Sequence, residues 1–345
     1  MPKKNKNVFL VAGGTGGHLF PAIAIAQRDK TKNFIFIVDE RVEKILKKYR
    51  VKYFVVSSSK LSKNFFYLIS DVFKILNGIV QSFFLIKKYK PNLVVGFGGY
   101  TCIPTMLTAK IFNVQTLIHE QNAVMGRTNR FLSNISNKTA ISFSKTKYAK
   151  QNSIFTGIPI RVFKKKKVKG DKKRILVLGG SQGAKVFSKV IPKILTGINK
   201  KYLKDLMIIQ QTRKEDKIFL ESIYNKLDIE CTIKEFFDDA QNEIYNSDIV
   251  FARCGSSTLA EIEYCKKFSF LLPLPTALDN HQMENAKQFK KKNNCTILNQ
   301  NKIPYESLRE SLKYHTLYKD VIKNNLKESK KKSLIKVIDD MIQKA

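Results

Sequence analysis

Two segments of this sequence open in the same way, with an apolar run, a glycine-rich turn and a helical segment. The first is VFLVAGGTGGHLFPAIAIA at residues 8–26, and the second is RILVLGGSQGAKVFSKVI at residues 174–191. Glycine suits a sharp strand-to-helix turn because it accepts positive φ and lets an anion approach backbone N–H groups. The following helix N-terminus adds free donors and a partial positive charge. The two segments predict two α/β halves, each with a phosphate-binding turn.

Short apolar runs recur along both halves, and each is followed by a longer segment of mixed polarity. Continuous apolar runs are typical of parallel strands buried on both faces. The expected strands are 8–12, 34–38, 53–56, 93–96, 115–118 and 139–142 in the first half, and 175–178, 207–211, 231–236, 249–252, 268–272 and 296–298 in the second. Segments such as 22–29 and 41–49 are expected to be helices. The fold class predicted by this alternation is α/β, with two doubly wound parallel-sheet domains.

A basic stretch, KKKKVKGDKKR at residues 164–174, separates the halves and contains almost nothing apolar. We interpret it as a solvated linker at a domain boundary. The predicted domains are residues 1–162 and 163–325, followed by a C-terminal helix at 326–345. The whole region from residue 306 onward is expected to be helical and basic.

The net charge is +35, from 63 Lys and Arg against 28 Asp and Glu. Such a surplus favours anionic partners such as nucleic acid, acidic lipid or phosphorylated substrates. However, only 10 of the basic residues are Arg, and a chain rich in Lys, Asn and Phe without Trp is also typical of an AT-rich genome. Both explanations stay open. No RRM, KH or helix-turn-helix signature is present, so no specific nucleic-acid partner is expected.

The five cysteines form no CxxC pair, which argues against a zinc site or a disulfide framework and favours a reducing cytoplasm. No secretory signal is expected at the N-terminus. The most apolar stretch, residues 65–86, is interrupted by Asp71, Lys74, Asn77 and Gln81. We therefore expect no membrane-spanning helix, and any contact with a membrane should be at its surface.

Other nucleotide-binding folds share glycine loops, so they are the first alternatives. Neither loop is a Walker A motif, because neither ends in Gly-Lys-Ser/Thr. The first loop lacks the third glycine of GxGxxG, since Leu19 stands at that position. Asp39, at the end of the second expected strand, could still imitate the ribose-binding acid of a nicotinamide dehydrogenase.

Longer motifs are more specific than the loops alone. They are GGTGGHxxPAxA at 13–24, GFGGY at 96–100, HEQNAVMGRTNR at 119–130, TGIPIR at 156–161, GGSQGA at 179–184, FFDD at 236–239, RCGSSTLAE at 253–261 and LPLPTALDNHQMENA at 272–286. In this order they resemble the MurG family of GT-B glycosyltransferases, over roughly residues 8–290.

The resemblance implies a GT-B fold with the active site between two Rossmann-like domains. It implies transfer of N-acetylglucosamine from UDP-N-acetylglucosamine to the 4-hydroxyl of N-acetylmuramic acid in undecaprenyl-diphospho-N-acetylmuramyl-pentapeptide (lipid I), with inversion, giving lipid II and UDP. No cofactor or essential metal is implied, and no DxD motif occurs in the chain. The N-terminal domain would bind the acceptor, the second domain the donor, and the C-terminal helix would return to the N-terminal domain. A related enzyme acting on another lipid acceptor is the alternative.

The resemblance also assigns residues on the acceptor side. His18 is the expected catalytic base, and its ordinary pKa suits that role; the alternative is that it only orients the loop. The expected acceptor ligands are Gly13, Gly14, Thr15, Gly16, Gly17, Tyr100 and Asn129. Asn129 could instead cap a helix. His119 is expected to be structural, because Ala123 occupies the second histidine position of an HExxH zinc motif.

On the donor side the resemblance assigns residues from both halves. The expected donor ligands are Thr15, Gly16, Gly17, Asn122, Arg161, Ser181, Gln182, Phe237, Glu261 and Gln282. Arg161 could instead be a surface arginine, and Glu261 could cap a helix together with Ser257. His281, Ser188 and Cys102 depart from the family pattern, so no role is carried over to them.

An acceptor with a long prenyl chain requires work at a lipid surface. The apolar residues Phe66, Ile69, Phe73, Leu76, Val80 and Phe84 recur at helical spacing, and Lys87, Lys88 and Lys90 follow them. This pattern is typical of an interfacial helix on an anionic inner-membrane surface. The alternative is a helix that packs this stripe on the sheet. The expected location is the cytoplasmic face of the inner membrane, as a peripheral protein.

Overall fold

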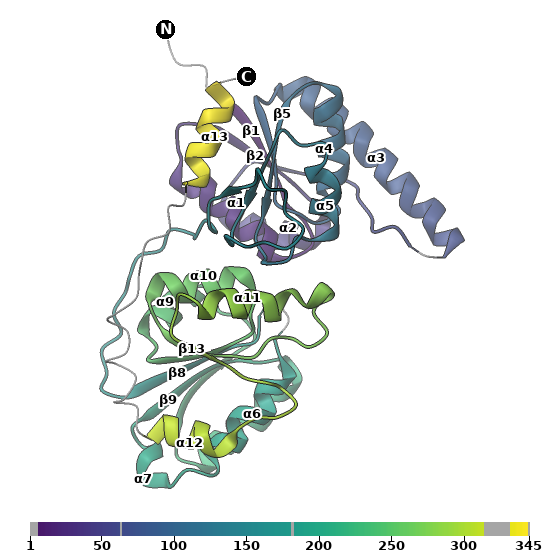
Figure 1. Cartoon of the computed structure of the whole chain (residues 1–345). Coiled ribbons are helices and arrows are strands. Elements are labelled where there is room, and N and C mark those ends of the chain that lie inside the picture. The colour runs from purple at the N-terminus through teal and green to yellow at the C-terminus, as the bar shows by residue number, and fades with distance from the viewer. Residues whose placement is uncertain (1–5, 63, 181–182, 314–331, 344–345) are drawn as a thin grey trace. The chain divides into compact units, whose positions relative to one another are not determined.

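The computed structural model describes residues 6–62, 64–180, 183–313 and 332–343. The chain divides into two compact units. Unit 1 comprises residues 1–162 together with 329–345, and unit 2 comprises residues 163–328. Figure 1 shows that each unit is a sheet covered by helices.

Unit 1 contains a seven-stranded sheet in which every recorded pairing is parallel. Its strands are β1 (Asn7–Val11), β2 (Asn33–Val38), β3 (Tyr53–Val55), β4 (Leu93–Gly96), β5 (Gln115–Glu120), β6 (Lys138–Ile141) and β7 (Ile154–Phe155), in the spatial order β3-β2-β1-β4-β5-β6-β7. The six strands predicted for this half are all present. The seventh, β7, is only two residues long and leaves no periodic pattern in the sequence.

Helices cover both faces of this sheet. They are α1 (Gly16–Arg28), α2 (Glu40–Leu46) with the 3-10 turn η1 (Lys47–Tyr49), α3 (Phe65–Tyr89), α4 (Cys102–Ile111), α5 (Arg127–Ser133) and α13 (Leu334–Gln343). The C-terminal helix α13 packs its apolar face into the same core as α1 and β1. An ion pair between Lys32 and Asp339 joins α13 to the turn before β2.

Unit 2 repeats this plan with six strands, again with every recorded pairing parallel. They are β8 (Lys173–Leu178), β9 (Leu206–Gln211), β10 (Glu230–Lys234), β11 (Ile249–Ala252), β12 (Phe268–Leu271) and β13 (Cys295–Ile297), in the order β10-β9-β8-β11-β12-β13. Its helices are α6 (Lys185–Leu195), α7 (Lys200–Leu203), α8 (Lys217–Lys226), α9 (Ala240–Asn246), α10 (Ser256–Cys265), α11 (His281–Lys290) and α12 (Tyr305–Lys313), with 3-10 turns η2 (Lys214–Asp216) and η3 (Leu278–Asn280).

Alternate residues of the central strands enter opposite cores, as expected of a sheet covered on both sides. In β1, Val8 and Leu10 lie in one apolar cluster, while Phe9 and Val11 lie in the other. In β8, Ile175 and Val177 are likewise separated from Leu176 and Leu178. The prediction of two doubly wound α/β domains is confirmed.

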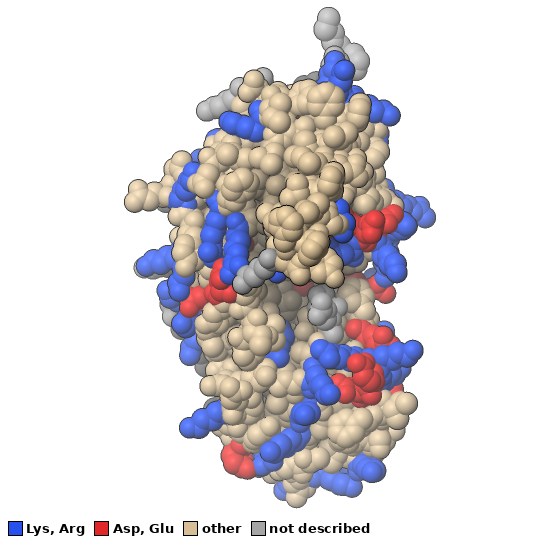
Figure 2. Space-filling view, turned by 90° about the vertical axis from the view of Figure 1, so that its right-hand side faces the viewer, with Lys and Arg blue, Asp and Glu red and all other residues tan. Residues whose placement is uncertain are grey.

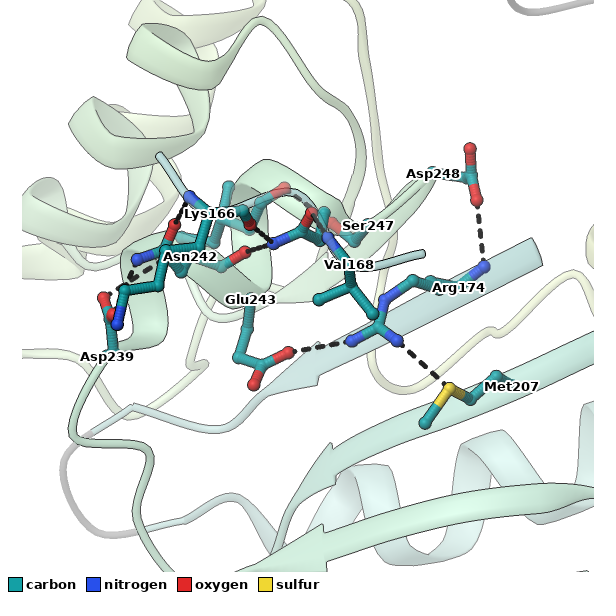
Figure 3. Close-up of polar contacts among 11 residues, drawn as sticks. Lys166, Val168, Arg174, Met207, Asp239, Asn242, Glu243, Ser247 and Asp248 are labelled. Atoms are coloured by element: carbon teal, nitrogen blue, oxygen red, sulfur yellow. Dashed lines mark hydrogen bonds and ion pairs between the residues drawn. The ribbon is translucent and has the colours of Figure 1, made fainter. Parts of the chain in front are cut away.

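The basic segment between the units is held against α9 and is not a freely solvated linker. Asn242 accepts from the backbone N–H of Lys166 at 3.0 Å (Figure 3) and donates to the carbonyl of Lys164 at 2.9 Å. Asn246 repeats this pattern with Val168 and Lys166. The predicted linker also ends too late, at residue 174, because residues 173–174 already belong to β8. Charge composition alone did not reveal these backbone partners.

Candidate active site

The first glycine loop joins β1 to α1, and its first two residues, Gly13 and Gly14, are positions that favour glycine. A Cβ on Gly13 would lie 2.0 Å from the Thr101 hydroxyl, and Gly14 has a φ of +83°. The Gly14 N–H donates to a carboxylate oxygen of Asp39 at 2.8 Å. This N–H is therefore already used within the protein, and the loop donors left for a ligand are those further along the turn.

Asp39 connects this loop to its neighbours. Its carboxylate also accepts from the Thr101 hydroxyl at 2.8 Å and forms an ion pair with Arg41 at 2.6 Å. Asp39 is 7% exposed, whereas the Arg41 side chain is half exposed. These contacts argue against the dehydrogenase alternative, since the carboxylate is already engaged by Gly14, Thr101 and Arg41.

His18 lies in the first turn of α1 and is half-buried. Its Nδ1 is 3.0 Å from Oε1 of Gln121, at the end of β5. The Gln121 Nε2 contacts His119, with 3.1 Å to Nδ1 and 2.9 Å to the carbonyl oxygen. The His119 Nε2 in turn faces the carbonyl of Gly157 at 3.0 Å. A continuous chain of hydrogen bonds therefore runs from His18 into the core of unit 1.

His119 is fully buried, and this burial lowers its pKa to about 4. The ring is therefore neutral near pH 7. This confirms the expectation that His119 is structural. It also packs on Phe97, with ring centroids 5.6 Å apart.

Glu120 organises the loop that follows β5. Its buried carboxylate accepts from the backbone N–H groups of Asn122 at 2.9 Å and Gly126 at 3.0 Å, and from the Asn129 amide at 2.8 Å. Asn129 does not cap α5, because the N-cap is Gly126, so the capping alternative is wrong. Within the described part of the chain, Asn129 Oδ1 is a buried atom without a hydrogen-bond partner. It is the kind of atom that a ligand donor would satisfy.

The turn between β4 and α4 lies beside His18 and Asn129 and completes the group of acceptor-side residues. Gly98 and Gly99 have φ values of +107° and +85°, and a Cβ on Gly98 would lie 2.9 Å from His18 Cε1. Tyr100 follows in the same turn and is half-buried. Cys102 is buried beneath it, accepting from the Gly98 N–H at 3.3 Å; burial raises the pKa of its thiol to about 12. Cys102 thus supports the turn as an unreactive thiol.

The second glycine loop joins β8 to α6. Gly180 and Gly183 have positive φ, and Ser181 and Gln182 lie outside the described residues. The Gly179 N–H donates to the side chain of Gln211 at 3.2 Å. Behind the loop, Ser188 is buried and shares a hydrogen bond of 3.2 Å with Thr212. Ser188 therefore serves the packing of α6 on β9.

The other residues expected on the donor side of unit 2 lie after a strand or within helices. Phe237 follows β10 and is buried, so its backbone is the part left to meet a ligand. Glu261 is half-buried within α10, whose N-cap is Gly255. A residue six positions after the N-cap cannot form a capping box, so that alternative is wrong.

Gln282 lies in the first turn of α11, and its carbonyl oxygen is already occupied. It accepts from the backbone N–H groups of Cys254 at 3.2 Å and Leu274 at 3.0 Å. The amide nitrogen is the atom left to donate. Nearby, Arg253 is 8% exposed and donates to the carbonyls of Leu272 and Pro273, both at 3.1 Å. These bonds shape the loop that precedes α11.

Besides the loop residues Thr15, Gly16 and Gly17, two further donor candidates lie in unit 1. The Arg161 guanidinium donates to the Tyr49 hydroxyl at 2.9 Å and lies 4.2 Å above the Phe20 ring. These contacts anchor Arg161 on unit 1, and its role toward the donor stays a prediction. The Asn122 amide donates to Glu120 at 3.2 Å.

Sequence reasoning missed several residues that hold these groups in place. Glu120 and Gln121 stand inside the HEQN motif without an assigned role, and Asp39 was considered only as a ribose ligand. Thr101 and Gln211 carry no motif signal. Each is a buried polar residue at a strand end or turn, and that placement was the available indication. Among the described residues, no group of three or more His, Cys, Asp or Glu side chains could hold a metal ion.

Comparison with known proteins places this geometry in a family. The N-terminal domain of glycosyltransferase family 28 matches residues 8–141, and its C-terminal domain matches residues 174–341. The chain belongs to glycosyltransferase family 28. A family relative from Rickettsia bellii is 35% identical over 98% of this chain and 100% of its own length. That relative is named UDP-N-acetylglucosamine–N-acetylmuramyl-(pentapeptide) pyrophosphoryl-undecaprenol N-acetylglucosamine transferase.

Solved structures agree with the family assignment. The crystal structure of Acinetobacter baumannii MurG is 26% identical, covers 99% of this chain and 100% of its own, and has a TM-score of 0.75. The calicheamicin glycosyltransferase CalG4 shares the fold at 9% identity, with a TM-score of 0.61 and coverage of 99% and 93%. The predicted resemblance and the predicted GT-B fold are both confirmed, and the family 28 chain is a glycosyltransferase.

Proposed function

We propose that this enzyme forms lipid II, by moving N-acetylglucosamine from UDP-N-acetylglucosamine to lipid I. The main support is the relative from Rickettsia bellii, a transferase named for this reaction, which is 35% identical over 98% of this chain. The residues that the resemblance assigns to acceptor binding support it, because Gly13, His18 and Asn129 come together in unit 1. Unit 1 then binds the acceptor and unit 2 binds the donor.

The chemistry follows from what the transfer requires. The acceptor 4-hydroxyl loses its proton to His18 as its oxygen attacks C1 of the donor sugar. The bond from C1 to the diphosphate breaks, and its electron pair leaves with UDP. Attack from the face opposite the leaving group inverts C1 and gives the β-linked product.

Binding roles follow the same division. In the acceptor site, the N–H groups of Gly16 and Gly17 and the Thr15 hydroxyl meet the diphosphate, while Tyr100 and Asn129 line the sugar. In the donor site, Ser181 and Gln182 meet the UDP diphosphate. Phe237 reads uracil through its backbone, Glu261 accepts from the ribose hydroxyls, and Gln282 donates to the sugar. Asn122 and Arg161, with Thr15, Gly16 and Gly17, are the residues of unit 1 that the resemblance assigns to the donor.

The support for a membrane role comes from helix α3. Its apolar side faces outward and its small and polar side faces the protein, which is the reverse of an ordinary packed helix. Its buried residues are Asp71, Gly78, Ser82 and Ile86. The Ser82 hydroxyl bonds to Thr105 of α4 at 3.0 Å, and a Cβ on Gly78 would lie 2.0 Å from a backbone carbonyl. The helix thus packs on unit 1 mainly through small and polar groups.

The outward side of α3 is apolar. Its exposed residues include Phe65, Phe66, Tyr67, Ile69, Val72, Phe73, Leu76, Val80, Phe83 and Phe84. Phe73 is 68% exposed and Phe66 80%, so the alternative of a stripe packed on the sheet is wrong. The 25 residues are long and apolar enough to cross a membrane by length and composition, contrary to our expectation. Together, these exposed apolar residues form the surface that we call the α3 apolar face.

We propose that the α3 apolar face lies on an anionic membrane as a peripheral anchor. An aromatic surface of this size has no partner inside unit 1, and such patches mark interaction sites. Lys87, Lys88 and Lys90 are exposed at the end of the helix, and each basic residue near such a surface adds about 1 kcal/mol. Figure 2 shows a tan projection on this side with blue side chains beside it. A peripheral position on the cytoplasmic side would bring unit 1 to a lipid-linked acceptor.

The transfer reaction tests the central proposal. Radiolabelled UDP-N-acetylglucosamine and a short-chain lipid I analogue are supplied to the full chain, with and without EDTA. We expect a labelled disaccharide lipid in both cases, since the family resemblance implies no essential metal. A folded protein that binds UDP-N-acetylglucosamine but transfers nothing to this acceptor would contradict the proposal, and other polyprenyl-linked sugars would then be tried.

Vesicle flotation tests the membrane proposal separately. The full chain is mixed with anionic vesicles or with neutral phosphatidylcholine vesicles, at low and high salt. We expect flotation with anionic vesicles at low salt, and a large loss in the double variant Phe73→Ser/Phe84→Ser. The matched control is Phe219→Ser, which changes an exposed phenylalanine of α8 in unit 2. Equal flotation of both variants, or none by the wild type, would overturn the membrane proposal.

A further inference from the structure

The contacts of Gln121 determine which nitrogen of His18 carries a proton. Gln121 is 1% exposed, and its amide lies between His18 on one side and His119 on the other. Its Nε2 is 2.9 Å from the backbone carbonyl oxygen of His119. A carbonyl oxygen only accepts, so the amide nitrogen must face it. The opposite orientation would place two oxygens in contact and leave the buried nitrogen poorly satisfied.

His119 supports the same orientation. Its Nε2 faces the carbonyl of Gly157 at 3.0 Å and must donate to it. Because burial keeps this ring neutral, its Nδ1 then has a lone pair and accepts from the Gln121 Nε2 at 3.1 Å. Two acceptors, one on the backbone and one on the ring, thus fix the amide of Gln121.

The fixed amide presents Oε1 to Nδ1 of His18 at 3.0 Å. An amide oxygen only accepts, so the hydrogen of a neutral His18 ring lies on Nδ1. Its Nε2 then carries the lone pair. Free histidine prefers the other tautomer, with the hydrogen on Nε2, so the protein must impose this one.

We propose that Gln121 is a positioning residue that holds His18 in the Nδ1–H tautomer, so that Nε2 is the atom that takes the acceptor proton. The role of the base rests on the proposed function, whereas the tautomer rests on geometry alone. During transfer the proton moves from the acceptor 4-hydroxyl to Nε2 while the O4–C1 bond forms and the bond from C1 to UDP breaks. The resulting imidazolium keeps its Nδ1–H bond to a neutral amide.

Other titratable groups around His18 are engaged elsewhere in the fold. Asp39 pairs with Arg41 and bonds to Gly14, and Glu120 accepts from Asn129 and the backbone. Tyr100 lies in the neighbouring turn, and His119 is neutral. Gln121 is therefore the group that bonds directly to the inner nitrogen of the base. A neutral partner orients the ring without placing a negative charge beside it.

The first test reads the tautomer in the wild-type protein. Long-range proton–nitrogen correlation spectra of the full chain, labelled with 15N-histidine, distinguish Nδ1–H from Nε2–H rings near pH 8. The His18 signal is assigned from its disappearance in His18→Asn. We expect Nδ1–H for His18 and Nε2–H for His119. A wild-type His18 ring with its hydrogen on Nε2 would overturn the proposal, whatever the activity.

The second test uses variants. Gln121→Leu should lower kcat by about 100-fold and shift His18 toward Nε2–H, with the KM for UDP-N-acetylglucosamine unchanged. The scale follows from the loss of about 10⁴ that a wrong tautomer causes in a serine protease triad. Gln121→Glu restores an acceptor at Nδ1 but adds charge, so the acidic limb of the kcat profile should move upward by about one pH unit or more.

Gln151→Glu is the matched control, because Gln151 is exposed in a turn of unit 1 outside the proposed site. It should leave both kcat and the pH profile unchanged. A folded Gln121→Leu protein with wild-type kcat and pH profile would overturn the positioning role. If that variant does not fold, the wild-type spectrum still decides. If the wild type transfers nothing to lipid I, the proposed function fails while the tautomer test stands.

Discussion

The two glycine loops share one backbone design but are held by different chemistry. Gly14 and Gly180, the second glycine of each loop, both have a φ of +83°. In unit 1 the brace is the carboxylate of Asp39, and in unit 2 it is the neutral amide of Gln211. Both braces come from the end of the strand beside the loop, β2 or β9. The comparison teaches that the shared glycine pair gives the same backbone angle at its second residue, while the neighbouring strand sets the local charge.

The charged brace has a consequence for anion binding. A carboxylate beside a diphosphate would repel it, and Arg41 offsets this charge from 2.6 Å away. A Cβ on Gly14 would lie 3.6 Å from the Arg41 guanidinium, so this cation lies close to the loop itself. The first loop is therefore a charge-balanced structure, whereas the brace of the second loop contributes no charge.

We expect the largest effect on kcat from replacing His18, the proposed base at the end of the first loop. His18→Ala should lower kcat by 10²- to 10⁴-fold, since it removes the proposed base from the first loop. The KM for UDP-N-acetylglucosamine and the thermal midpoint should change little, because His18 is only half-buried. Steady-state transfer kinetics and thermal unfolding measure both. A variant with near wild-type kcat would remove His18 as the base and break the proposed division.

Replacing the charged brace should have the next largest effect. Asp39→Ala leaves the Gly14 N–H, the Thr101 hydroxyl and Arg41 without their acceptor, at a cost of about 1–3 kcal/mol in unfolding free energy. It should also raise the KM for the lipid I analogue. Denaturant unfolding and acceptor kinetics test this, with Asp171→Ala in the exposed inter-unit segment as control. Equal effects on donor and acceptor KM would contradict a role confined to the first loop.

Replacing Gln211, the neutral brace, should have a smaller effect, and the KM that changes should be that of the donor. Gln211→Leu removes the acceptor of the Gly179 N–H and the donor to the Glu235 carbonyl, whereas no charge is left unpaired. We expect a rise of about 3- to 10-fold in the KM for UDP-N-acetylglucosamine, on the scale of one or two ordinary hydrogen bonds. The acceptor KM should stay at its wild-type value. An effect on the acceptor KM alone would reverse the assignment of the two loops.

The smallest expected effect is a difference in acid stability between the units. Hydrogen bonds from Lys47 lower the pKa of Glu43, and those from Ser59 lower that of Asp71. For Asp29, burial alone would raise the pKa, but bonds from Lys32 and Thr31 bring it below its ordinary value. All three carboxylates lie in unit 1.

Because these pKa values are lower in the folded state, the carboxylates stabilise unit 1 above about pH 4, their ordinary range. That contribution is lost as the pH falls through the lowered values. Hydrogen exchange between pH 6 and pH 3 should therefore show protection falling in unit 1 before unit 2. Lys32→Met should lessen the pH dependence by removing the partner of Asp29. Earlier loss in unit 2 would contradict this prediction.

Much of the fold could be predicted because parallel strands buried on both faces leave continuous apolar runs. All twelve predicted strands exist, and every boundary is shifted by two residues or fewer, as at β5, which extends to Glu120. The two-residue strand β7 was missed, since no period can be read from two residues. The outward side of α3 was also undecided, because helical spacing identifies a stripe and does not say what covers it.

The sequence by itself determined the two strand–loop–helix units and the family, because local turn chemistry and ordered motifs are written along the chain. It also brought His18, Asn129 and Glu261 forward as candidates. Only the tertiary structure decided how those candidates are held. Asp39, Thr101 and Gly14 meet from three separate segments. The hydrogen bonds from His18 through Gln121 and His119 to Gly157 likewise join three segments. Such contacts depend on strand order and packing, and residue spacing does not record them.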